Sequence, residues 1–158
     1  MIFRTVSSRR IALDDLVAGA ARRDRSRRLR AAGFVRAFEA TFRSDAGPRG
    51  PRDALGAAAT AVLFADEPGA RRAVAIIAES ERELGPLGGD GIVAVPASSL
   101  GREAWGFRVS LLAGDAVFYG WHERNVVLLA AMGGRAGAFA EEDAHAYADA
   151  VEARARTR

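Results

Sequence analysis

The residues that could carry acid–base chemistry in this chain are few. His122 and His145 are its two histidines, and imidazole is the side chain whose unperturbed charge changes near neutral pH. The pattern HERNV, which contains His122, lacks the second histidine of a metalloprotease helix, and no other pair has the spacing of metal ligands. We expect both histidines to be solvated at the surface, His122 at a hairpin tip and His145 on the polar side of a C-terminal helix.

No serine lies in a recognisable nucleophile motif. Ser98 and Ser99 follow a proline in a predicted loop, and the sequence contains no G-x-S-x-G elbow. The sequence therefore predicts no catalytic residue, no metal ligand and no cofactor. A small hydrolase using His122 or His145 is the least supported of the functions that we consider.

Acidic residues accompany basic ones along one predicted helix. Glu79 and Glu83 are four residues apart, and Glu81 lies beside Arg82. This spacing is typical of charges on a helix surface, where each pair is worth roughly tenths of a kcal/mol. A glycosidase-type acid pair would depend on the distance between two carboxyls in space, which sequence spacing does not give.

Three aromatic residues are candidates for a ligand site: Trp105, Tyr119 and Trp121. All three fall in or beside predicted strands, where packing into a core is the usual role of an aromatic side chain. The alternative is that they line a pocket between sheet and helix that takes an apolar small molecule. That pocket is the small-molecule site that the sequence offers.

A basic cluster stands near the N-terminus, in the stretch RRDRSRRLR. One interpretation is a site for nucleic acid, an acidic lipid surface or an acidic partner. The other is a solvated helix face or flexible arm whose arginines reflect codon usage. No aromatic residue interleaves with them, so the stacking platform of a single-strand binder is missing. The candidate anion-binding residues are Arg22, Arg23, Arg25, Arg27, Arg28 and Arg30.

The composition excludes several kinds of chemistry. The chain has no cysteine, lysine or glutamine, and all 23 of its basic residues are arginine. Disulfides, cysteine nucleophiles, lysine Schiff bases and the lysine of a phosphate-binding loop are therefore absent. The net charge is +3, but it is unevenly placed: residues 1–52 hold 13 Arg against 5 acidic residues, and residues 53–158 hold 10 Arg against 15.

The length of 158 residues suits one folded domain. We divide the chain into a basic N-terminal helix or arm (1–32) and a single α+β domain (33–158). No stretch approaches the roughly 18 uninterrupted apolar residues of a membrane span, and the first residues lack the basic region of a signal peptide. The sequence as it stands predicts a soluble protein without an export signal, and its compartment stays open between extracytoplasmic and cytoplasmic.

Hydrophobic periodicity predicts an alternation of strands and helices. Asp66 is a candidate N-cap for a helix over 66–84, and acidic and basic ends mark a second helix over 139–156. Short helical turns are expected within 11–18 and 100–105. The order indicates an α+β fold in which helices flank an antiparallel sheet. The predicted strands are 34–43, 57–65, 92–95, 106–113, 116–121 and 126–132.

The segment 117–133, VFYGWHERNVVLLAAMG, joins two strongly apolar runs across a tight turn. We expect it to form a hairpin at the centre of the sheet. Asn125 is the non-glycine residue that best tolerates the left-handed backbone of such a turn. The hairpin is therefore the predicted core of the fold.

Together with AVLFADEPGARRAV (61–74) and VPASSLGREAWGF (95–107), this hairpin resembles the PsbP/Mog1-like α+β sandwich group. LpqN-like envelope lipoproteins of actinobacteria and extracellular sensor domains of bacterial Ser/Thr kinases have a similar layout. The resemblance implies an αβα sandwich and an exported, non-enzymatic binding, sensing or assembly module. The implied partner is another protein or an apolar small ligand at the cell envelope, and the resemblance carries over no functional residue.

Overall fold

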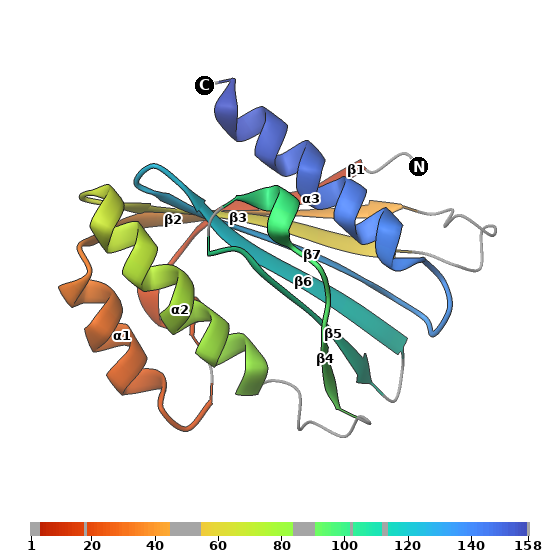
Figure 1. The fold of residues 1–158 in the computed structure, drawn as a ribbon, viewed down its shortest axis with the longest axis horizontal. Coiled ribbons are helices and arrows are strands. Elements are labelled where there is room, and N and C mark those ends of the chain that lie inside the picture. Colours follow the sequence, from red (N-terminus) through yellow and green to blue (C-terminus); the bar gives the residue numbers. More distant parts are fainter. Residues whose placement is uncertain are drawn as a thin grey trace.

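One antiparallel sheet organises the protein (Figure 1). The computed structural model describes residues 4–17, 19–44, 55–83, 91–101, 103–111 and 114–157. In this part of the chain, seven strands lie in the order β1-β2-β3-β7-β6-β5-β4. They are β1 (Arg4–Ile11), β2 (Phe34–Ser44), β3 (Leu55–Phe64), β4 (Ile92–Ala94), β5 (Trp105–Leu111), β6 (Gly114–Glu123) and β7 (Val126–Gly134).

Helices cover both faces of this sheet. Helices α1 (Arg22–Ala31) and α2 (Glu67–Glu83) lie side by side on one face, and α3 (Glu141–Arg156) lies on the other (Figure 1). Two short 3₁₀ turns, η1 (Leu13–Asp15) and η2 (Ser98–Leu100), complete the described elements. The structure confirms the predicted α+β class, an antiparallel sheet flanked by helices.

Strand alternation divides the apolar side chains between two cores. In β3, Val62 and Phe64 pack with α1 and α2, whereas Leu55 belongs to the core under α3. In β7, Val127 joins the first core and Leu128 the second. Successive strand residues point to opposite faces, so a strand between two helical layers must be apolar in both directions.

Helix α2 begins where its capping chemistry predicts. The Asp66 carboxylate accepts a hydrogen bond from the backbone N–H of Gly69 at 2.7 Å, which satisfies one of the donors left free at a helix start. On this helix, Ala73, Ile76 and Ile77 form a buried apolar stripe. The last residue of the helix predicted over 66–84 lies outside the described residues.

The N-terminal part of the chain belongs to the same sheet and core as the rest. Strand β1 pairs with β2, and Leu29 of α1 is fully buried in the core that α2 shares. The boundary that we placed after residue 32 therefore corresponds to no break in the packing. Strand β1 carries no periodicity signal because every residue of it except Ile11 is exposed.

The central hairpin is confirmed, but its turn works differently from the prediction. Arg124, and not Asn125, is the turn residue with a left-handed backbone, at φ 53°. Asn125 instead ties the turn to β3: its side-chain N–H donates to the Phe64 carbonyl at 3.0 Å, and its own carbonyl accepts from the Phe64 N–H at 2.9 Å. Asn125 is therefore explained by its contact between the hairpin turn and β3.

Two glycines make room for aromatic rings across the β5–β6 pair. Trp105 lies opposite Gly120, and Gly106 lies opposite Tyr119. A Cβ at Gly120 would overlap the Trp105 ring, and a Cβ at Gly106 would overlap the Tyr119 ring. Each ring therefore lies across the partner strand at a place where only glycine fits.

We expect Gly120→Ala to destabilise the fold by about 1–3 kcal/mol, because the Trp105 ring must leave its place. Gly133→Ala on the neighbouring strand is the matched control, since its Cβ would have its nearest neighbour at an ordinary 3.5 Å. Urea unfolding of both variants measures the difference. Equal unfolding free energies for the two variants would contradict the proposed fit of ring over glycine.

Candidate functional site

The structure separates the three aromatic residues that we selected as ligand-binding candidates. Trp105 lies on the face of the sheet that carries α2 and donates its indole N–H to the Val74 carbonyl of that helix at 3.2 Å. Tyr119 and Trp121 are buried in the core under α3, with 1% and 0% of their surface exposed. Of the three, Trp105 alone is partly exposed.

Trp105 heads a row of stacked rings. Its ring stacks on Phe107 with centroids 5.1 Å apart and an angle of 12°, and Phe107 stacks on Phe118 at 5.4 Å and 28°. The hydrogen bond to Val74 and the fit over Gly120 hold the indole in place. The sheet thus presents a rigid aromatic wall to the space under α2.

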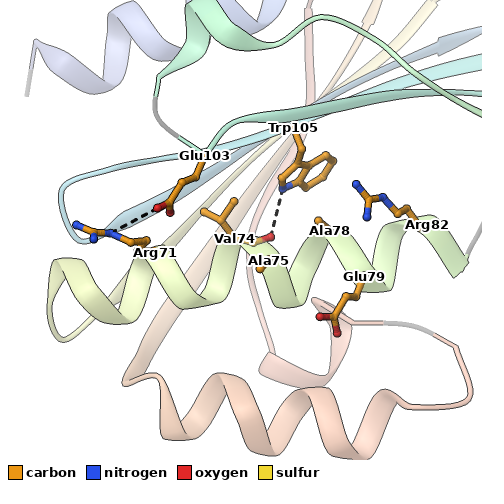
Figure 2. Close-up of a pocket in the computed structure, with 8 residues that line it drawn as sticks. All are labelled: Arg71, Val74, Ala75, Ala78, Glu79, Arg82, Glu103 and Trp105. Atoms are coloured by element: carbon orange, nitrogen blue, oxygen red, sulfur yellow. Dashed lines mark hydrogen bonds and ion pairs between the residues drawn. The ribbon is translucent and has the colours of Figure 1, made fainter.

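Two hollows border Trp105, and together we call them the Trp105 cleft. The outer hollow, of about 330 Å³, runs along α2 (Figure 2). The inner hollow, of about 200 Å³, lies between α2 and the sheet. Tyr119 also borders the inner hollow, although its ring packs edge-on against His145 of α3. The other main walls of the inner hollow are Trp105, Phe118, Leu129, Ala131, Glu39 and Glu81.

Glu81 gives the inner hollow its chemistry. It is half-buried, and burial raises the pKa of its carboxyl to about 7 from an ordinary 4.5. Sequence reasoning missed it by treating it as a surface charge. The missed signal is its spacing: Glu81 follows Val74 by seven residues and Ile77 by four, so it continues the buried stripe of α2.

The outer hollow is lined by charges of both signs. Arg71 lies 3.9 Å from Glu103 and 3.7 Å from Glu67. Arg71 and Glu103 mark one end of the hollow in Figure 2. Arg82 lies toward the other end of the helix and has no ion-pair partner among the described residues. The outer hollow therefore has two arginines and two glutamates in its lining, so its formal charges balance.

His122 is not at the surface, contrary to the prediction. Only 9% of its side chain is exposed, and its Nε2 lies 3.8 Å from a Glu103 oxygen. Neither ring nitrogen has a hydrogen-bond partner among the described residues. The reason is register: β6 continues to Glu123, so His122 pairs with the fully buried Val127 and shares its face of the sheet.

His145 lies on α3, on the opposite side of the sheet from the Trp105 cleft. Its side chain is 28% exposed, which is more enclosed than the solvated position that we expected. Ser99 and Asp149 hydrogen-bond to its two ring nitrogens. The structure thus brings Ser99 to the His145–Asp149 pair, a contact across 46 residues that sequence spacing could not show.

The arginines of α1 are largely paired with acidic residues. Arg25 is 5% exposed and makes a two-pronged ion pair with Glu83, and Arg28 does the same with Glu79 at 2.7 and 3.3 Å. Arg22, Arg27 and Arg30 lie within ion-pair distance of Asp15, Asp24 and Asp14.

Among the described residues, Arg23 alone of the six arginines has no acidic partner. The cluster therefore joins α1 to α2 and η1, and its use as an anion-binding site stays a prediction.

The described residues contain no group of three or more side chains able to hold a metal ion. None of the described helices has the length and apolar composition that crossing a bilayer requires.

No known protein family matches the sequence, and no curated protein matches it significantly. Among solved structures, the extracellular domain of PknH from Mycobacterium tuberculosis has a similar fold, with a TM-score of 0.56 and 10% sequence identity over 99% of this chain and 86% of that one. At this identity the likeness concerns the fold alone. It confirms the expected likeness to a kinase extracellular domain at the level of the fold, and the likeness to lipoproteins and to the PsbP/Mog1-like group stays a prediction.

The raised pKa of Glu81 predicts a stability that falls as the pH rises. The folded state holds the Glu81 proton up to about pH 7, whereas the unfolded state releases it near pH 4.5. Stability from this group is therefore complete below pH 4.5 and is lost between pH 4.5 and 7, by on the order of 2–3 kcal/mol. Glu81→Gln should lack this fall when unfolding free energies are measured at pH 5 and pH 8.

Glu79→Gln is the matched control, two residues earlier on α2. The hydrogen bond from Arg28 lowers the pKa of Glu79, so its removal should weaken the fold at pH 8 and not at low pH. A Glu81→Gln protein with the same pH dependence as the wild type would contradict the assigned burial.

Arg25→Met should lower the unfolding midpoint, because it leaves Glu83 without its partner and breaks the contact between α1 and α2. Arg23→Met should stay within about 0.5 kcal/mol of the wild type, as surface changes without partners usually do. Urea unfolding compares the two. If Arg23→Met lowers the unfolding free energy more than Arg25→Met does, Arg25 does not have the structural role that its ion pair with Glu83 indicates.

Proposed function

We propose that this chain is a binding or sensing module that takes a small ligand with an apolar ring and a cationic amine in the Trp105 cleft. One observation carries the proposal: a half-buried carboxyl, Glu81, faces a hollow whose other walls are mostly aromatic and aliphatic, apart from Glu39 and Thr60. Pockets of this kind, apolar with a few polar groups, are typical of small-molecule sites.

The apolar walls favour the ring of the ligand. Trp105 and Phe118 belong to one stacked row, and Leu129 and Ala131 of β7 adjoin them. A flat apolar group entering the inner hollow removes its own surface and theirs from water, at roughly 25 cal/mol per Å². These walls stand on strands, so they need little rearrangement to receive it.

The carboxyl of Glu81 determines which polar head group of a ligand the hollow favours. A neutral ligand would enclose the carboxylate further without a partner, which costs free energy. An ammonium group would supply both a hydrogen bond and the opposite charge, so it stabilises the ionised form that burial now disfavours. The second acid of the hollow, Glu39, already pairs with Arg9 at 3.1 Å, which leaves Glu81 as the group that needs a cation.

The fold likeness supports a role at the cell envelope, because the similar structure is an extracellular domain. The alternative of an anion-binding α1 has less support, since five of its six arginines have acidic neighbours. The cleft is therefore the binding surface that we propose.

The test uses the Trp121→Phe variant, which leaves Trp105 as the sole tryptophan and fluorescent reporter of the cleft. It is titrated at pH 8 with 3-phenylpropylamine, 3-phenylpropanol and 3-phenylpropionate, which share a ring and differ in charge. We expect saturable changes in Trp105 emission with affinity in the order amine, alcohol, carboxylate. The amine should bind about tenfold more tightly than the alcohol, the scale of a hydrogen bond to a charged group.

Glu81→Gln in the same background should remove the advantage of the amine and leave the alcohol unchanged. Glu67→Gln, on α2 but outside the lining of both hollows, should leave both affinities unchanged. If none of the three compounds gives a saturable signal, the cleft is not the binding site. If the amine keeps its advantage in Glu81→Gln, Glu81 does not select the head group.

A further inference from the structure

Ser99, His145 and Asp149 form a continuous hydrogen-bonded chain on the α3 side of the sheet. The Ser99 Oγ lies 3.0 Å from His145 Nε2, and His145 Nδ1 lies 3.2 Å from Asp149 Oδ2. Ser99 comes from η2, 46 residues before the histidine, whereas Asp149 lies one turn after it on α3. The connectivity is that of a serine nucleophile, a histidine base and an orienting carboxylate.

The donors and acceptors in this chain have one consistent arrangement when the carboxylate is ionised and the imidazole neutral. A carboxylate can only accept, so His145 Nδ1 must carry the ring proton. Nε2 then has a lone pair and accepts the hydrogen bond, so the Ser99 hydroxyl is the donor. The proton of Ser99 is therefore directed at a base.

Buried neighbours hold the three groups in place. Leu100, next to Ser99, is fully buried, and so are Ala144 and Ala148 on α3, at 1% and 0% exposure. The Tyr119 ring packs edge-on against the imidazole, with centroids 5.5 Å apart and an angle of 78°. The hydroxyl of Ser99 itself is open to solvent, since the residue is exposed. Buried neighbours therefore hold the three side chains in place, while Ser99 stays accessible from the solvent.

We propose that Ser99 is an activated nucleophile that accepts acyl groups from small activated esters, with His145 as its base and Asp149 as a positioning residue. Ser99 Oγ attacks the carbonyl carbon as its proton passes to His145 Nε2. The tetrahedral adduct collapses by breaking the bond to the leaving alkoxide, which takes that proton from His145. An acyl-serine and a free alcohol result, and attack by water through the same base returns serine and a carboxylic acid.

The class of substrate follows from exposure. His145 is 28% and Asp149 51% exposed in their side chains, so water weakens the electrostatic help that an enclosed relay gives. The site should therefore act on esters with good leaving groups rather than on amides. It also lies on the other face of the sheet from the Trp105 cleft, and Ser99→Ala should leave amine binding there unchanged.

The test is labelling of the full chain with a fluorophosphonate probe, followed by peptide mass spectrometry, and acylation by p-nitrophenyl acetate. We expect the probe to form its adduct at Ser99. The rate of labelling should be unchanged in Ser98→Ala, the matched control from the same turn. His145→Gln should slow labelling by about 10- to 100-fold, at the low end of the range for a general base because the site is open. Labelling of Ser99 no faster than Ser98, or unchanged in His145→Gln, would overturn the proposal.

The role of Asp149 is tested with a measurement that separates positioning of the base from stabilisation of the fold. Asp149→Asn keeps the size of the side chain but can present an N–H to Nδ1, which favours the tautomer whose Nε2 cannot accept from Ser99. Labelling should slow in Asp149→Asn and recover in part in Asp149→Glu, while thermal unfolding of the two stays alike. If Asp149→Asn labels at the wild-type rate, Asp149 does not position the base.

Discussion

The structure depends on one constraint: the central strands are covered by helices on both faces, so each must be apolar in two directions. The β6–β7 hairpin meets this demand most fully, since α2 contacts it from one side and α3 from the other. Val127 and Leu128, adjacent in sequence, are buried in different cores. The sheet is stable only as the middle layer of this sandwich.

The same constraint creates both candidate sites. At the β5–β6 pair, each aromatic ring lies across a glycine of the partner strand, Trp105 toward α2 and Tyr119 toward α3. The Trp105 ring forms the wall of a hollow because α2 crosses the sheet and leaves space between Glu81 and the strands. On the other face, the Tyr119 ring supports the imidazole of His145. Trp105 and Tyr119, which lie in adjacent residue pairs of the β5–β6 ladder, therefore support candidate sites on opposite faces of the sheet.

Ion pairs near the N-terminus stabilise the packing of α1 against α2. Helix α1 carries many arginines, and its apolar anchor, Leu29, is one buried side chain among them. The ion pairs of Arg25 and Arg28 with Glu83 and Glu79 attach α1 to α2 beside that anchor. A net positive segment is therefore compatible with a folded, integrated helix because its acidic partners lie on the next helix.

The sequence by itself determined the fold class, the hairpin and the start of α2, because periodicity and capping are local properties. The N-cap Asp66 and the apolar runs around Arg124 could be read directly, since each depends on neighbours a few residues away. Strand β1 was not predicted, because an exposed edge strand has no buried face and therefore no apolar alternation.

Only the tertiary structure decided what the polar residues do. Glu81 became a half-buried acid because α2 turns it toward the sheet, and His122 became buried because strand register gives it the face of Val127. Ser99 met His145 and Asp149 because η2 packs against α3. These outcomes depend on contacts between residues tens of positions apart, and composition and spacing do not contain that information.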